Sequence, residues 1–135
     1  MQNDTRNAGA SPIGSTLEAL AATIDQRKAA TEESYTHRLL EGKLDSLLKK
    51  VSEESLETCL AAKETDLIPE GEQQAASTDH LRYEAADLIY HLMVLLSRFG
   101  ISNDDLAAEL NARMTPEERP HGARVMEQDH INRGK

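Results

Sequence analysis

The 135-residue sequence has no tryptophan, a single phenylalanine and a single cysteine. Aromatic residues make up only 3% of the chain, so its hydrophobic core must consist mainly of Leu, Ala, Val and Ile. Scarce aromatic residues, together with plentiful Ala, Leu, Glu and Lys, disfavour strands and favour helices. The single cysteine, Cys59, excludes an intrachain disulfide, and we expect it to be a buried or half-buried helix residue. A chain of this length normally forms one domain around one core.

The sequence also has fewer basic than acidic residues. The chain has 15 Lys and Arg residues against 24 Asp and Glu residues, which gives a formal net charge of −9. A field of that sign repels nucleic acid and anionic membranes, so neither is an expected partner. The N-terminal residues lack the apolar segment of a signal peptide, and the longest apolar run, LIYHLMVLL, is too short to span a bilayer. We therefore expect a cytoplasmic protein.

Helical periodicity and capping signals divide the chain into segments. Ser15 with Glu18, and Ser102 with Asp105, match the capping box, and Ser34 is a candidate N-cap for a short helical turn. The sequence shows neither strand alternation nor a glycine-rich phosphate loop, so it is predicted to be all-α. We expect a disordered segment over 1–14, a helical domain over 15–114 and a polar tail over 115–135. Within the domain, helices are expected at about 16–28, 35–42, 43–64, 78–99 and 103–114.

The helix expected at 78–99 is the most apolar of these segments. From Ala85 to Phe99 nearly every side of it is apolar. Because a helix with apolar residues all round needs neighbours on every side, we expect it to be the central and most buried element.

Acidic residues recur at a spacing of three in both long helices. Glu54 and Glu57 lie side by side on one helix, and Glu84 and Asp87 on the other, in each case flanking the apolar stripe. If the two helices pack antiparallel, both pairs converge at one edge of the core. Carboxylates gathered in a partly buried place repel one another and need a proton or a cation. Oxygen ligands without Cys or His favour Mg²⁺, with Mn²⁺ as an alternative, over zinc.

A simpler interpretation has to be weighed against the metal site. A single pair of acids on a helix is usually a solvated face, whereas two pairs beside the apolar stripes of the two best-defined helices are less ordinary. His91 lies in line with Glu84 and Asp87, but a histidine there is more often a core residue with a hydrogen-bond partner than a metal ligand. Glu53 points further toward solvent than Glu54.

Two long stretches, SYTHRLLEGKLDSLLKKVSEESLETCLAAK and YEAADLIYHLMVLLSRFGISNDDLAAEL, resemble a known family. Their order and motifs are similar to the phosphoribosyl-ATP pyrophosphohydrolases of histidine biosynthesis. These enzymes are all-α nucleotide pyrophosphohydrolases of the MazG type, whose mark is E-x-x-E, a spacer and E-x-x-D. The resemblance covers residues 16 to 113. Ser52 departs from it, since relatives often have glycine there.

The resemblance implies Mg²⁺-dependent hydrolysis of phosphoribosyl-ATP to phosphoribosyl-AMP and pyrophosphate. It also implies a helical bundle that is completed by dimerisation, and the helix expected at 78–99, which is apolar on nearly every side, agrees with a homodimer. Any of Glu53, Glu54 and Glu57 is a candidate for the catalytic carboxylate that takes up a proton. By position, the implied metal ligands are Glu54, Glu57, Glu84 and Asp87, the residues near the phosphates are Lys49 and Lys50, and the residues near the substrate are Ser34, Tyr35 and Thr36. Arg38, a cation in the same short segment, is a further candidate for binding the substrate.

Two other functions stay open at this point. The first is a housecleaning nucleoside-triphosphate pyrophosphohydrolase with the same metal site and another base pocket. The second is a non-catalytic helical dimer module whose acids are merely solvated. The segment SYTHRLL favours the histidine enzyme over the first, and the doubled acidic motif disfavours the second.

Overall fold

The computed structural model describes residue 9 and residues 11–127. Within these residues the chain forms helices and no strand, so the predicted all-α class is confirmed. The predicted disorder of residues 1–8 and 10, and the last part of the predicted tail, lie outside the described residues. The helices are α1 (Ile13–Ala29), α2 (Tyr35–Glu41), α3 (Leu44–Leu67), α4 (Glu72–Arg98) and α5 (Asn103–Asn111).

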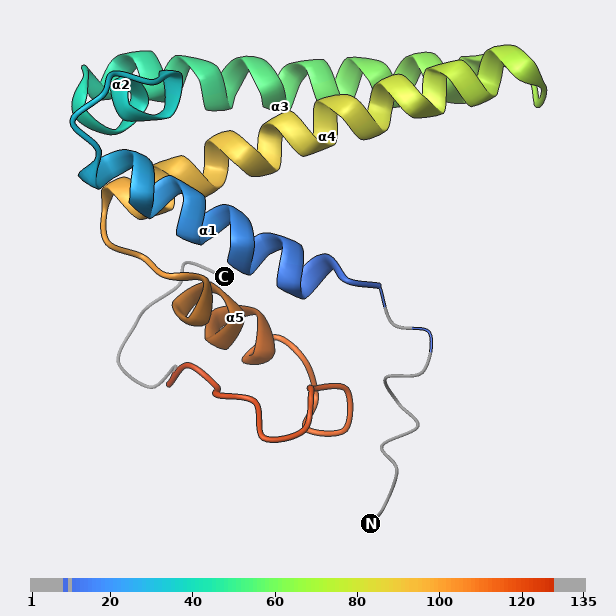
Figure 1. The fold of residues 1–135 in the computed structure, drawn as a ribbon. Helices are drawn as coiled ribbons and strands as arrows, with labels where there is room; N and C mark the ends of the chain where they lie inside the picture. Colours follow the sequence, from blue (N-terminus) through green and yellow to red (C-terminus); the bar gives the residue numbers. More distant parts are fainter. Residues whose placement is uncertain (1–8, 10, 128–135) are drawn as a thin grey trace.

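Helices α3 and α4 form a long antiparallel hairpin, whose tip projects beyond the other helices (Figure 1). The turn at the tip spans only residues 68–71, where Gly71 has a φ of +147°. Helix α4 thus begins at Glu72, and its predicted start at about residue 78 is wrong. Ser77 is instead buried between the two helices, and its hydroxyl lies 2.8 Å from the Thr65 hydroxyl. Packing across the hairpin thus extends both helices into residues 65–77, which the prediction had left between two helices.

The hydrophobic core lies at the other end of the hairpin, where α1 and α2 pack against it. Leu47 of α3 and Val94 of α4 are fully buried, together with Ile24 of α1. Two leucines of α2, Leu39 and Leu40, complete this cluster. The short helix α2 therefore lies against both long helices, and α1 lies against α4.

Helix ends follow the capping signals with one exception. The Ser34 hydroxyl accepts from the His37 N–H, and Ser102 with Asp105 forms the expected capping box. The box expected at Ser15 is wrong, because α1 begins earlier, at Ile13. The preceding Pro12 has a φ of −74°, close to helical, and the Ser11 hydroxyl accepts from the Ile13 N–H.

One side of the molecule leaves apolar residues uncovered. Helix α4 contacts α1, α2 and α3, which confirms its central position, yet Ile89 is 43% exposed, Leu92 39% and Phe99 62%. A single chain therefore leaves one side of α4 uncovered. Cys59 is also exposed, contrary to expectation, because α3 contacts only α2 and α4 and leaves its other sides open.

The segment after α5 folds back onto that helix. The Asn111 side-chain amide donates to the Arg124 carbonyl, and the Met126 N–H donates to the Ala108 carbonyl. Arg124 also pairs with Asp104 and Asp105 in the first turn of α5.

No single helix of the described residues is long and apolar enough to cross a membrane. Only α4 and α5 taken together reach that length and composition, and the two helices meet at an angle of 107°.

Candidate metal and substrate site

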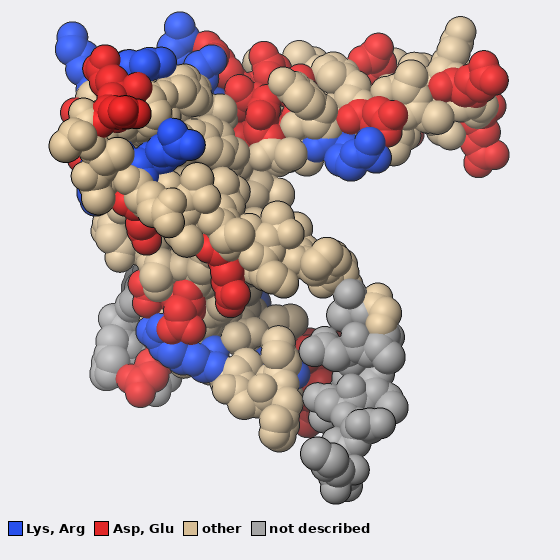
Figure 2. Space-filling model, in the orientation of Figure 1, with Lys and Arg blue, Asp and Glu red and all other residues tan. Residues whose placement is uncertain are grey.

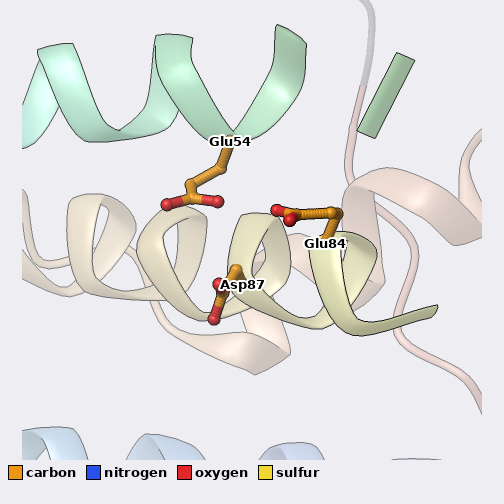
Figure 3. Close-up of side chains that lie close together, drawn as sticks. All are labelled: Glu54, Glu84 and Asp87. Atoms are coloured by element: carbon orange, nitrogen blue, oxygen red, sulfur yellow. The ribbon is translucent and has the colours of Figure 1, made fainter. Parts of the chain in front are cut away.

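Three carboxylates meet across the hairpin. Glu54 extends from α3 toward Glu84 and Asp87 of α4, and one oxygen of each lies within 4.8 Å of the others (Figure 3). The spacing of three residues places Glu84 and Asp87 on one face of α4. The antiparallel packing of α3 then brings Glu54 opposite that face.

Two of these carboxylates are buried without full hydrogen bonding. Glu54 is 7% exposed and Glu84 is 8% exposed, and the Oε2 atom of each is buried with no hydrogen-bond partner. Burial, together with the neighbouring Asp87 and Glu57, raises the pKa of Glu54 to about 7. A buried anionic oxygen without a partner is costly, so the cluster fits either a shared proton or a bound cation. Carboxylate oxygens are the ligands that Mg²⁺ and Mn²⁺ prefer.

Glu57 and Glu53 lie outside this cluster of three oxygens. Glu57 is exposed one turn beyond Glu54, close enough to influence its pKa. Glu53 faces the two predicted phosphate-binding lysines, with its carboxylate oxygens 3.6 Å from Lys49 Nζ and 3.4 Å from Lys50 Nζ. Glu53 raises the pKa of Lys50. Such partly exposed ion pairs are weak, so both lysines can exchange this partner for a phosphate.

Helix α2 is joined to α4 directly beside the carboxylates. The Tyr35 hydroxyl lies 2.8 Å from His91 Nε2, and His91 Nδ1 lies 2.8 Å from the Asp87 carbonyl oxygen. A carbonyl only accepts, so Nδ1 carries a proton, and in the tautomer protonated there alone Nε2 accepts from the Tyr35 hydroxyl. The next residues along each helix are joined as well, since Thr36 Oγ1 lies 2.5 Å from the Tyr90 hydroxyl.

His91 is thus a buried residue with hydrogen-bond partners, as the sequence predicted. Sequence reasoning missed Tyr90, whose only available signal was its position beside His91.

The substrate residues predicted on and before α2 lie in one place. Ser34 caps the helix, Tyr35 is 42% exposed, and Arg38 is exposed one turn later. Burial raises the pKa of the Tyr35 hydroxyl, whereas the nearby Lys50 lowers it. Lys and Arg side chains gather where α2 and the start of α3 lie, although the protein as a whole is acidic (Figure 2). This end of the molecule therefore offers positive charge next to the carboxylates.

Sequence reasoning also missed His80, one turn before Glu84 on α4. Its Nε2 atom lies 3.0 Å from Glu84 Oε1, and its Nδ1 atom lies 3.9 Å from Glu64 Oε2. The spacing of four residues between His80 and Glu84 was the available signal.

Comparisons with known proteins agree on one family. The family model for phosphoribosyl-ATP pyrophosphohydrolase matches residues 17–114. A phosphoribosyl-ATP pyrophosphatase of Paracidovorax citrulli is 38% identical over 120 residues, which cover 84% of this chain and 82% of the relative. Proteins with the same name from an Azoarcus species and from Limosilactobacillus fermentum are 41% and 46% identical over 98 residues, which cover 72% of this chain and 81% and 82% of the relatives. No solved structure shows significant similarity to the chain. The chain belongs to the phosphoribosyl-ATP pyrophosphohydrolase family.

Proposed function

We propose that this chain hydrolyses phosphoribosyl-ATP between the α- and β-phosphates and releases phosphoribosyl-AMP and pyrophosphate, the second step of histidine biosynthesis. The observation that carries the proposal is the group of three carboxylates, two of them with buried unpartnered oxygens, in a chain of this family. The names of its relatives support the substrate.

We propose that Glu54, Glu84 and Asp87 hold Mg²⁺, with Mn²⁺ as a substitute. Their oxygens suit a hard cation, and a cation removes the cost of burying unpartnered carboxylates. Glu57, one turn from Glu54, would be the fourth ligand. A divalent cation held there supplies positive charge that neutralises the phosphates and makes a water molecule more acidic.

The remaining residues bind the substrate and move the proton. Lys49 and Lys50 leave Glu53 and pair with phosphate oxygens, which frees the Glu53 carboxylate to accept a proton from the attacking water. The part of the substrate that carries the second ribose phosphate is bordered by Ser34, Tyr35 and Arg38. That group is what distinguishes phosphoribosyl-ATP from an ordinary nucleotide.

A substrate comparison tests this function. The purified chain with Mg²⁺ should release pyrophosphate from phosphoribosyl-ATP with a kcat/KM about 100-fold or more above that for ATP or any deoxynucleoside triphosphate, because contacts to the second ribose phosphate are lost with the plain nucleotides. A preference for a plain deoxynucleotide would contradict the proposal and indicate a housecleaning enzyme.

We further propose that two chains form a homodimer through the uncovered apolar side of α4. A groove between α1, α4 and α5 runs along this side. An apolar groove of this kind is typical of an interface between identical subunits. Its lining includes Leu17, Ile89, Leu92, Leu106 and Leu110.

Changing Leu92 to aspartate tests the dimer. Leu92 is 39% exposed in the single chain, so the charge is tolerated by the monomer but not at an interface. Analytical ultracentrifugation should show a dimer for the wild type and a helical monomer for Leu92→Asp. A wild-type protein that sediments as a monomer at micromolar concentration would contradict the dimer.

A further inference from the structure

The two oxygens of Glu84 have different surroundings. Oε1 lies 3.0 Å from His80 Nε2, whereas Oε2 is buried and has no hydrogen-bond partner. A carboxylate only accepts hydrogen bonds, so His80 Nε2 carries the proton and donates it to Oε1. Both the neutral Nε2–H tautomer and the charged ring meet this requirement. The hydrogen bond therefore does not depend on the ionisation of His80.

The position of His80 follows from the helix. A spacing of four residues places it above Glu84 on the same face of α4, and the hairpin brings Glu64 of α3 to its other side. Glu64 Oε2 lies 3.9 Å from His80 Nδ1, beyond hydrogen-bond distance, so it acts on the ring through its charge alone. The His80 ring thus lies between Glu84, which belongs to the carboxylate cluster, and Glu64, which does not.

We propose that His80 is a positioning residue for the metal site. It holds Glu84 in one orientation, in which Oε1 is occupied and Oε2 is the oxygen presented to the cation beside Glu54 and Asp87. The inference rests on the metal site of the proposed function and adds a residue that lies outside its ligand set. Residues that orient metal ligands in this way commonly change metal affinity by about 10–100-fold when they are removed.

Experiments can distinguish a structural role of His80 from its role in positioning Glu84 at the metal site. Its side chain is 52% exposed, so shortening it opens no cavity in the core. The melting temperature of the metal-free protein should therefore fall in His80→Ala only by the small amount that the loss of one hydrogen bond to Glu84 costs. The main change should be in metal affinity.

The test is the binding of Mn²⁺ to the full chain, followed by the electron paramagnetic resonance signal of free Mn²⁺ without any substrate. We expect the Kd for Mn²⁺ to rise by about 10–100-fold in His80→Ala. His80→Gln, whose amide places an N–H near the position of Nε2, should recover most of the affinity. His121→Ala removes an exposed histidine that lies in the segment after α5, and should bind Mn²⁺ like the wild type.

Two results would overturn the role of His80 while leaving the metal site in place. Wild-type affinity in His80→Ala would show that Glu84 needs no positioning. An equal loss in His80→Ala and His80→Gln would show that ring shape, and not the hydrogen bond, matters. A wild type that binds no Mn²⁺ would instead remove the metal site itself and the role of His80 with it, so the two failures are distinguishable.

Discussion

Replacing Glu54 with glutamine should abolish pyrophosphate release while making the metal-free protein more stable. Glu54 contributes the only α3 oxygen of the three-carboxylate cluster, so its loss removes the connection across the hairpin. A cation contributes several kcal/mol of transition-state stabilisation, so kcat/KM should fall by about 10³-fold or more. The glutamine amide donates to the neighbouring carboxylates instead of repelling them, which stabilises the fold.

Asp66→Asn is a matched control on the same helix, because Asp66 is an exposed acid that pairs only loosely with Lys63. It should leave both activity and stability unchanged. Kinetics on phosphoribosyl-ATP and urea denaturation without metal measure the two effects. Loss of more than about 2 kcal/mol of stability in Glu54→Gln would mean that the carboxylate is part of a structural network and not a site of repulsion.

Metal-free protein should lose stability as the pH rises from 5 to 8. The pKa of Glu54 is about 7 in the fold, against an ordinary value of 4.5, so the folded state binds more protons than the unfolded state between these values. The free energy of unfolding therefore decreases with rising pH through this window, and the loss is complete once the pH exceeds the folded pKa. We expect a decrease of about 1–3 kcal/mol from this group.

Denaturant unfolding at several pH values, with a chelator present, measures this decrease. Saturating Mg²⁺ should oppose it, because a cation that binds only the folded state stabilises that state and favours ionised ligands. Glu54→Gln should show a much flatter dependence over the same range. Wild-type stability that rises steadily from pH 5 to pH 8 would contradict a raised pKa at this site.

Hydrophobic periodicity was sufficient to predict the part of the fold that places the carboxylates. The all-α class followed from the lack of strand alternation. The apolar stripes placed the acids beside the core, and the antiparallel packing that the sequence analysis took as a condition brings Glu54 to Glu84 and Asp87. These features depend on spacing along one helix and on burial of one face, and both are readable from a single sequence.

Features that depend on distant neighbours were not readable in the same way. Ser77 resembles a helix start until α3 is seen to bury it, and Cys59 resembles a core residue until its side of α3 is seen to be open. Tyr90 acquires its role from its contact with Thr36 of α2. Local capping and composition carry no information about such contacts. The burial and the partners of these residues are set by tertiary packing, which the sequence alone does not show.

The proposed metal dependence is tested most directly by measuring pyrophosphate release from phosphoribosyl-ATP by the purified chain in three successive conditions. These are excess Mg²⁺, then an excess of chelator over Mg²⁺, and then Mg²⁺ restored above the chelator. Because the three carboxylates are proposed to act through a bound divalent cation, release should be rapid, absent and rapid again. Undiminished release in excess chelator would contradict the account, because the carboxylates would then work without a cation.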